Sequence, residues 1–354
     1  MALLPGLFHT KARPRPQSAY AAYAVRTVMV DPDFRCSPVL RTGVFVLMAG
    51  CSMAAAAADD ASTWLARMTS AVRTLDYQGS FIYERNGQVD ALRLFHAGGT
   101  PERERLVTMT GPRSEVLRAS DSLTYTQAGQ PTMLVPNAAS VRLLPLVPDL
   151  SRPSLANLYA MTMRGEDRVA GYRTQIVDVL PRDGYRYGYR VWIEDSTGLP
   201  LRSAVVDGAG RLLEQFMFVA LDIGAKPKES DLVHGADAGV MTPQAETTLE
   251  GKPHWGVADL PPGFVFILAQ RPMQAPTQIE HQIYTDGLAC VSVYVEPRDT
   301  AVPSAPDALA TRGALGVYSH DADAWRITAI GNVPATSLER IARSVRPAAK
   351  NGGS

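Results

Sequence analysis

The sequence predicts a mostly β, α+β protein: an N-terminal curved antiparallel half-barrel with helices, plus a smaller C-terminal α+β domain. The chain of 354 residues suits about two domains. Between residues 77 and 223, apolar and polar residues alternate with period two between Gly, Asn and Pro turns, which is typical of an antiparallel meander. About ten such strands behind one long helix favour a partly open barrel with room for an apolar ligand.

The N-terminal region carries the pattern of an export signal. Arg41 precedes a short apolar run at 44–50, and an alanine tract ending at Ala58 follows. This order is typical of a secretory signal peptide cleaved near Ala58, and the run is too short for a membrane span. We assign the signal peptide region to residues 29–58, so the mature protein is expected to be exported and soluble.

Two features complicate the start of the chain. Residues 1–28 lie upstream of the signal and form a doubtful N-terminal extension, because Met29 is a better placed translation start. The sequence before Cys51 approximates a lipobox, so acylation at this cysteine is the alternative to soluble export. The alanine tract supplies a cleavage site of its own, which favours soluble export.

Charge and cysteine content argue against a nucleic-acid-binding protein and against a protein stabilised by intrachain disulfides. The 35 basic residues balance the 35 acidic ones, and no long run of one sign occurs. The sequence therefore predicts no nucleic-acid partner. Cys36 and Cys51 leave with the signal, so Cys290 alone remains in the mature chain. An intrachain disulfide is then excluded, and both domains must be stable through their apolar cores.

The N-terminal domain is predicted to span residues 59–224. It opens with a helix that Ser62 or Thr63 can cap. The apolar stripe of this helix comprises Trp64, Leu65, Met68, Val72 and Leu75. Strands follow, and a helix or loop at 154–163 interrupts them.

Residues 225–252 are rich in Lys, Pro, Glu, Asp, Gly, Thr and Ala without sustained period, and we interpret them as an interdomain linker. The C-terminal domain is predicted at 253–348, before a tail at 349–354. Its strands are FVFILAQ, QIEHQIY, LACVSVYVE, GALGVYSH and AWRITAIG. A final helix places Leu338, Ile341, Ala342 and Val345 on one face, with Thr336 and Glu339 spaced as a capping box.

The segment DGLACVSVYVE contains Cys290. Strand alternation places Ala289, Val291, Val293 and Val295 on one core face, and Cys290 on the opposite, mixed face. A catalytic thiol needs a nearby base or an electropositive setting, and the neighbouring residues offer neither. We therefore predict that Cys290 is a strand residue and not a nucleophile.

The sequence predicts no enzyme, no metal site and no cofactor. It contains no H-E-x-x-H, no G-x-S-x-G, no P-loop and no G-x-G-x-x-G. His281 and His320 are predicted to be hydrogen-bonded sheet residues and not a catalytic pair. An exported hydrolase with groups assembled from distant segments is a minor alternative.

Several blocks of sequence carry a resemblance to a known family. They are WLARMTSAVRTLDYQGSFIYER, YGYRVWIEDSTGLPLRSAVVDGAGRLLEQFMF, LPPGFVFI, YTDGLACVSVYVE, RGALGVYSH and WRITAIGNVPATSLERIARSV. In this order, over nearly all of residues 60–345, they resemble the RseB/MucB family of periplasmic regulators of the envelope-stress (sigma-E/AlgU type) sigma factor.

The resemblance implies a lipid-sensing N-terminal domain similar to the lipoprotein carrier LolA and a C-terminal domain that binds an anti-sigma factor. It implies a periplasmic negative regulator. Members bind the periplasmic domain of an RseA/MucA-like anti-sigma factor, shield it from DegS-type proteolysis, and release it on sensing lipopolysaccharide or lipoprotein acyl chains. The family has no catalytic residues. The alternative function is a LolA-like periplasmic carrier of lipoproteins or lipids, and a homo-oligomer is left open.

Two sets of candidate site residues follow. The lipid-binding candidates are apolar positions of the curved sheet and of a flexible lid at 154–163, namely Phe81, Tyr83, Leu92, Leu94, Leu106, Leu123, Tyr125, Leu134, Leu155, Leu158 and Met161. The partner-binding candidates lie on the mixed strand face and the basic edge beside it, namely Tyr294, Ser292, Arg312, Arg340 and Arg343.

Overall fold

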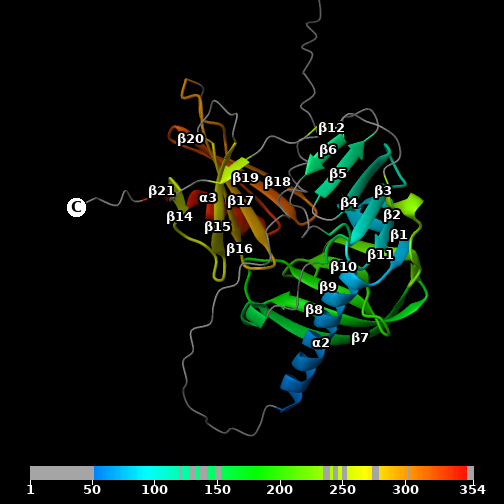
Figure 1. Ribbon diagram of the computed structural model, residues 1–354. Coiled ribbons are helices and arrows are strands. Elements are labelled where there is room, and N and C mark those ends of the chain that lie inside the picture. The colour runs from blue at the N-terminus through cyan, green and yellow to red at the C-terminus, as the bar shows by residue number, and fades with distance from the viewer. Residues whose placement is uncertain are drawn as a thin grey trace, which may run out of the picture.

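The computed structural model describes residues 52–119, 122–127, 132–135, 142–147, 153–233, 240–241, 246–248, 253–272, 279–301 and 303–348. The predicted extension at 1–28, the signal region up to Cys51 and the tail at 349–354 lie outside the described residues. The two domains lie side by side, with the N-terminal domain in blue to green and the C-terminal domain in yellow to red (Figure 1).

The first described element is helix α2 (Ser52–Thr74). It starts ahead of the predicted caps, so Ser62 and Thr63 lie inside the helix and the capping prediction was wrong. The physical reason is the preceding alanine tract, since alanine has the highest helix propensity. Among the described residues, no helix has the length and apolar character needed to cross a membrane.

One large sheet forms the N-terminal domain. Its strands are β1 (Tyr77–Arg85), β2 (Gln88–Ala97), β3 (Arg103–Thr108), β4 (Ser114–Ala119), β5 (Ser122–Gln127), β6 (Thr132–Val135), β7 (Tyr159–Val169), β8 (Tyr172–Pro181), β9 (Gly188–Glu194), β10 (Pro200–Val206), β11 (Leu212–Ile223) and the short β12 (Val240–Met241). The order is β12-β6-β5-β4-β3-β2-β1-β11-β10-β9-β8-β7, and among the described strands every neighbouring pair except β12–β6 is antiparallel. This confirms the predicted antiparallel meander.

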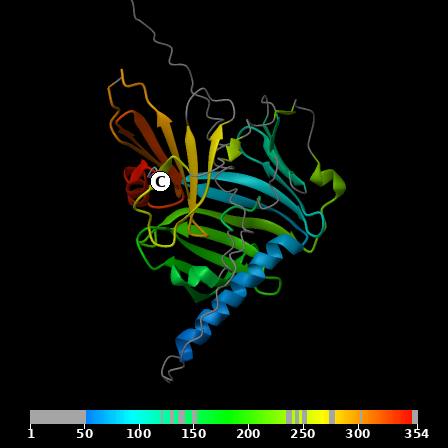
Figure 2. The same cartoon turned by 60° about the vertical axis from the view of Figure 1, so that its left-hand side comes forward.

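The sheet is strongly curved. Figure 2 shows the cyan strands and the green strands as two halves of one bent sheet, with α2 running along the green half. Leu94 and Leu123 from one half and Leu201 from the other belong to the same buried apolar cluster. We call the face that carries these residues the inner face and the opposite side the outer face.

The predicted helix or loop at 154–163 is only partly present. A short 3₁₀ helix, η1 (Pro153–Asn157), is followed by strand β7, which already begins at Tyr159. Pairing with β8 decides this conformation, because Tyr159 lies opposite Pro181 and Met161 opposite Val179. The predicted flexible lid was therefore wrong in its second half, where tertiary pairing fixes a strand.

The predicted linker at 225–252 contributes to both domains. The 3₁₀ helix η2 (Glu229–Leu232) folds back on the outer face, where Leu232 packs against Phe95 and Ala97. Further on, β13 (Glu246–Thr248) pairs with a strand of the second domain. The composition of this segment hid these contacts, because a single buried leucine carries the packing on the N-terminal side.

The C-terminal domain is built on a second sheet of β13, β15 (Val265–Pro272), β16 (Glu280–Thr285), β17 (Cys290–Pro297), β20 (Trp325–Gly331), β19 (Leu315–Ala322) and β18 (Ala308–Arg312), in that order. A small sheet pairs β14 (Trp255–Val257) with β21 (Val345–Pro347). Helix α3 (Ala335–Arg343) packs on β19 and β20. The edge strand β18 was not predicted, because all of its residues are exposed and show no alternation.

The predicted apolar faces of this domain are confirmed. Val291, Val293 and Val295 are fully buried, and so are Leu338 and Ile341 of α3. The predicted capping box was wrong, since α3 starts after Pro334 and no side chain caps it. Proline ahead of the first turn already fixes a conformation suited to helix entry.

Candidate functional site

The inner face of the N-terminal sheet collects most of the predicted lipid-binding residues. The register aligns Leu94 with Leu106, Leu106 with Val116, and Val116 with Tyr125. Cross-strand partners point to the same side of a sheet. The candidates brought together on this face are Phe81, Tyr83, Leu92, Leu94, Leu106, Leu123 and Tyr125.

Leu134 does not join them. It pairs with Thr124, whereas the inner-face residue Leu123 pairs with Val135. Leu134 therefore lies on the outer face, and its assignment to the apolar surface of the sheet was wrong by one position. A one-residue error in register moves a side chain to the opposite face.

Aromatic rings form the centre of the inner face. Phe81, Phe216 and Phe218 are buried, and their ring centroids lie 5.6–6.0 Å apart in edge-to-face arrangements. The same cluster contains Leu143 and Leu144, which come from a segment without helix or strand structure. The inner face is thus apolar, but the chain's own side chains cover it.

The predicted lid residues lie near the boundary between the domains. Leu155 is fully buried, and it shares a cluster with Leu288 and Ala314 of the C-terminal domain. Leu158 approaches the backbone of Gly263, where a Cβ atom would lie 2.7 Å from the leucine Cδ1. Gly263 has a φ of +83°, so a larger residue there would be both strained and in collision. These leucines connect the two domains.

A buried ion pair joins the domains at this boundary. Arg186 donates from Nη1 to Asp286 Oδ2 at 2.7 Å, and neither side chain has any exposed area. Tyr159 donates to the same carboxylate oxygen at 3.1 Å. Burial first, and the charge of Asp286 second, raise the pKa of Tyr159 well above its usual value, so its hydroxyl remains a donor.

Further hydrogen bonds extend this junction on both sides. Arg186 donates from Nη2 to the carbonyl of Pro262 at 2.6 Å, and Ser337 donates to the carbonyl of Tyr185 at 2.9 Å. At the other end, the backbone of Gly313 donates to Asn86 at 3.1 Å. The domains therefore meet through buried polar contacts as well as apolar ones.

The partner-binding candidates lie in different environments. Ser292 is buried and hydrogen bonded to His281 Nε2 at 3.0 Å, and the ring of His281 stacks on Tyr294. The β-sheet hydrogen-bonding role predicted for His281 is confirmed. Because its side chain is covered, Ser292 is not available at the surface of this structure.

The three arginine candidates already contact other residues. Arg340 pairs with Asp259 and contacts the hydroxyl of Tyr185, while Arg343 pairs with Glu339 and Asp307. Hydrogen bonds to the Asp259 and Glu339 carboxylates raise the pKa of Arg340 and Arg343, respectively. Arg312 reaches Gln88 of the N-terminal domain at 3.5 Å. Each of these arginines thus has an intramolecular partner that a bound protein would have to replace or share.

Cys290 is confirmed as a strand residue. Its thiol is half-buried, and burial, followed by the charge of Asp286, raises its pKa to about 12. A thiol in this state is protonated at neutral pH and is a poor nucleophile.

The sequence analysis missed a buried polar cluster on the inner face, formed by His96, Glu102, Glu104 and Arg118. His96 Nε2 lies 3.1 Å from Glu102 Oε1 and 3.8 Å from Glu104 Oε1. Arg118 pairs with both carboxylates at 2.7 Å. Arg142 lies 3.6 Å from Glu102, so two guanidinium groups match the charge of the two carboxylates. The arrangement therefore gives no support for a metal ion, even though the possible ligand atoms lie within 4.8 Å.

This cluster had a detectable signal. Register places Tyr77, His96, Glu104 and Arg118 in one row across four strands. Charged residues at the apolar phase of alternating strands indicate a buried network, because charges are rarely buried without partners.

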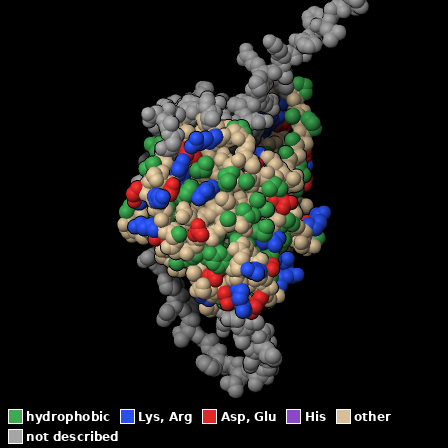
Figure 3. All heavy atoms as spheres, turned by 90° about the vertical axis from the view of Figure 1, so that its right-hand side faces the viewer, with side chains coloured by type: hydrophobic (Ala, Val, Ile, Leu, Met, Phe, Trp, Pro, Cys, Tyr) green, Lys and Arg blue, Asp and Glu red, His purple; other side chains and the backbone are tan. Residues whose placement is uncertain are grey.

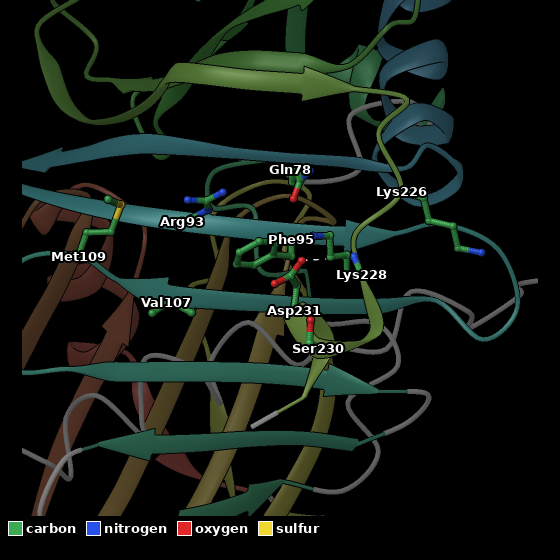
Figure 4. A pocket seen from close by; sticks show the side chains of 9 residues that line it. All are labelled: Gln78, Arg93, Phe95, Val107, Met109, Lys226, Lys228, Ser230 and Asp231. Atoms are coloured by element: carbon green, nitrogen blue, oxygen red, sulfur yellow. Dashed lines mark hydrogen bonds between the residues drawn. The ribbon is translucent and has the colours of Figure 1, made fainter. Parts of the chain in front are cut away.

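The outer face carries a separate pocket of about 630 Å³, beside η2. Figure 4 shows Phe95 at its centre, with Arg93, Lys228 and Asp231 around it and Met109 and Val107 along one side. Asp231 accepts a hydrogen bond from the backbone of Lys228 at 3.3 Å. Elsewhere, the molecular face in Figure 3 mixes basic, acidic and hydrophobic side chains, in keeping with the balanced charge.

These features define a two-domain, β-rich protein whose buried charged groups Arg118, Arg186 and Asp286 are used in structural ion pairs. Residues 60–236 match the MucB/RseB N-terminal domain, and residues 250–346 match the MucB/RseB C-terminal domain. The chain belongs to the MucB/RseB family, which is a family of sigma factor regulatory proteins and not of enzymes.

Individual relatives agree with this assignment. The chain is 36% identical over 323 residues to the sigma factor AlgU regulatory protein MucB of Pseudomonas aeruginosa, covering 88% of this chain and 99% of MucB. It is 31% identical to the sigma-E factor regulatory protein RseB of Salmonella typhimurium, covering 82% of this chain and 92% of RseB.

Solved structures support the fold as well. The crystal structure of MucB in complex with MucA(peri) matches with a TM-score of 0.66 at 33% identity, covering 82% of this chain and all of that chain. The crystal structure of MucB alone matches with a TM-score of 0.58.

Proposed function

We propose that this protein is a periplasmic negative regulator of a sigma-E-type envelope stress response. It binds the periplasmic part of an RseA/MucA-like anti-sigma factor and shields it from DegS-type proteolysis. The observation that carries the proposal is similarity to MucB across both domains, including a MucB structure in complex with MucA(peri). The export signal in the sequence is consistent with a periplasmic location.

The signal for release is an acyl chain of lipopolysaccharide or of a lipoprotein, bound at the inner face of the N-terminal sheet. Aromatic and aliphatic side chains from Phe81, Leu94 and Phe216 supply the required apolar surface. Each buried methylene contributes roughly 0.8 kcal/mol, so about ten sequestered carbons match the roughly 8 kcal/mol of a micromolar protein contact, and a longer chain exceeds it. Release occurs only if the chain binds the free form more tightly than the complex.

The regulator is favoured over a carrier of lipids or lipoproteins by the junction between the domains. Arg186 and Asp286 are both buried there, and breaking such a pair is costly. A carrier needs only the N-terminal domain, whereas a regulator needs a second domain whose position depends on the first.

Titration calorimetry tests the proposal with the mature protein and the periplasmic segment of the anti-sigma factor encoded beside it. We expect a dissociation constant below about 10 µM, in the range of specific protein complexes. An unrelated periplasmic peptide of equal length is the control. No heat of binding at tens of micromolar would reject the regulatory role.

A further inference from the structure

The segment Arg142–Val147 occupies the middle of the inner face, and we call it the plug. Leu143 and Leu144 are buried in the same cluster as Phe81, Leu94 and Phe216. Leu146 and Val147 pack against this cluster and also against the second cluster of the domain, which lies under α2. The plug therefore bridges the two apolar clusters without belonging to any helix or strand.

Polar contacts to the described residues lie at both ends of the plug. At its start, Arg142 lies 3.6 Å from Glu102 of the polar cluster. The backbone of Leu143 donates a long hydrogen bond to Glu104 Oε2 at 3.4 Å. At its end, Ser203 donates to the carbonyl of Leu146 at 2.6 Å. The plug is not a strand of the sheet, so its displacement leaves the pairing of the described strands in place.

The backbone of the plug is held in an unfavourable conformation. Leu146 has a φ of +57°, a left-handed conformation that leucine rarely adopts and that persists only when the surroundings impose it. Because Leu143 and Leu144 are buried in the cluster of the inner face, the apolar surface that the plug covers supplies these surroundings.

We propose that the plug occupies a binding site for a single acyl chain and that the chain binds by displacing it. The inference rests on the acyl-chain sensing proposed above and deepens it. The four apolar side chains of the plug contain about fifteen carbon atoms, which corresponds to one chain of roughly 12 to 16 carbons. The ligand of this site is thus a linear hydrocarbon. When no chain is bound, the plug side chains occupy its place, namely Leu143, Leu144, Leu146 and Val147.

Displacement lowers the apparent affinity for the chain. A site open in about one molecule in ten binds its ligand about tenfold more weakly than a permanently open site. Weakening the plug must then strengthen acyl-chain binding, and fixing it must prevent binding. A simple surface site would respond to neither change.

The first experiment fixes the plug. Leu146→Cys and Ser203→Cys are combined with Cys290→Ser in the mature protein and joined by a short, cleavable dithiol-reactive linker. The probe is dodecanoate carrying a solvent-sensitive dye. We expect the linked protein to bind the probe at least about tenfold more weakly than the unlinked protein, with recovery after cleavage of the linker. The Leu146→Cys single variant treated with the same reagent is the control.

The second experiment weakens the plug. Leu143→Ser with Leu144→Ser should bind the same probe about tenfold more tightly. A matched control replaces two exposed leucines, Leu212→Ser with Leu309→Ser, whose side chains lie outside the plug. This control should leave probe affinity unchanged.

The outcomes separate the plug from the proposed function. Equal probe binding by linked and unlinked protein overturns the plug proposal and leaves acyl-chain sensing intact. Absence of probe binding in every variant, including the weakened plug, overturns both the plug and acyl-chain sensing. Binding of the anti-sigma segment, measured in parallel, reports on the regulatory role independently of both.

Discussion

Both large sheets have an apolar face, and the two faces are covered differently. The C-terminal sheet is covered by α3, whose Leu338 and Ile341 are fully buried. The N-terminal sheet is covered partly by α2 and partly by the plug, which has no regular structure. A helix carries its own hydrogen bonds, whereas an irregular segment depends on contacts that a ligand can replace. We infer that α3 is a permanent part of its domain, whereas a ligand can take the place of the plug.

The largest expected effect concerns the junction that holds the two regions together. Asp286→Ala leaves Arg186 buried without its carboxylate partner, so we expect a loss of about 3–5 kcal/mol in the free energy of unfolding, measured in urea. Glu229→Ala is the matched control, because Glu229 pairs with Arg103 at the surface. It should show no resolvable change. Equal effects of the two substitutions would contradict a structural role for the junction.

Helix α3 and the plug should differ in how much stability is lost when a buried leucine is shortened to alanine. We expect Leu338→Ala in α3 to cost about 3 kcal/mol, because a rigid helix leaves a cavity. Leu144→Ala in the plug should cost about 1–2 kcal/mol, since an irregular segment can collapse into the space. Both values come from urea unfolding. A larger cost at Leu144 than at Leu338 would show that the plug is as rigid as the helix.

The smallest expected effect is a change in acid sensitivity at the start of the plug. Burial raises the pKa of Glu102, but the hydrogen bond with His96 and the charges of Arg118 and Arg142 outweigh it, so the pKa is lowered from 4.5. The ionised Glu102 carboxylate therefore stabilises the folded protein above pH 4.5. This contribution is lost as the pH falls through the lower pKa that Glu102 has in the folded state.

Glu102→Gln should remove this part of the pH dependence, changing stability by less than about 1 kcal/mol between pH 6 and pH 3. Chemical unfolding at several pH values measures it, with Glu166→Gln at the exposed Arg173 pair as control. A steeper loss of stability in acid for Glu102→Gln than for the unmodified protein would contradict the assignment.

Much of the fold could be predicted because strand alternation is local. The period of two located β17 and the inner-face positions from Phe81 to Tyr125, and the 3.6-residue period located the buried face of α3. The predicted face of Leu134 was wrong because it depends on the register between β6 and β5, which the sequence of β6 alone does not specify. The edge strand β18 was not predicted because all of its residues are exposed, so its sequence shows no alternation of apolar and polar residues.

The site was harder to predict than the fold. The polar cluster assembles His96, Glu104 and Arg118 from three strands, and only the pairing of those strands shows that they form a row. The plug was missed because its leucines follow no helical or strand period. Leu155 and Leu158 were predicted as parts of a lipid-binding lid, but their position at the domain junction depends on contacts with Leu288 and Gly263.

In the proposed mechanism, an acyl chain on the inner face controls binding of the anti-sigma factor. The most direct measurement is calorimetric affinity for the periplasmic anti-sigma segment, with and without a saturating dodecanoyl-chain amphiphile held below its micelle concentration. A short-chain amphiphile with the same headgroup is the control. We expect the long chain to weaken the affinity at least about tenfold and the short chain to leave it unchanged. An unchanged affinity in the presence of bound long chain would contradict it.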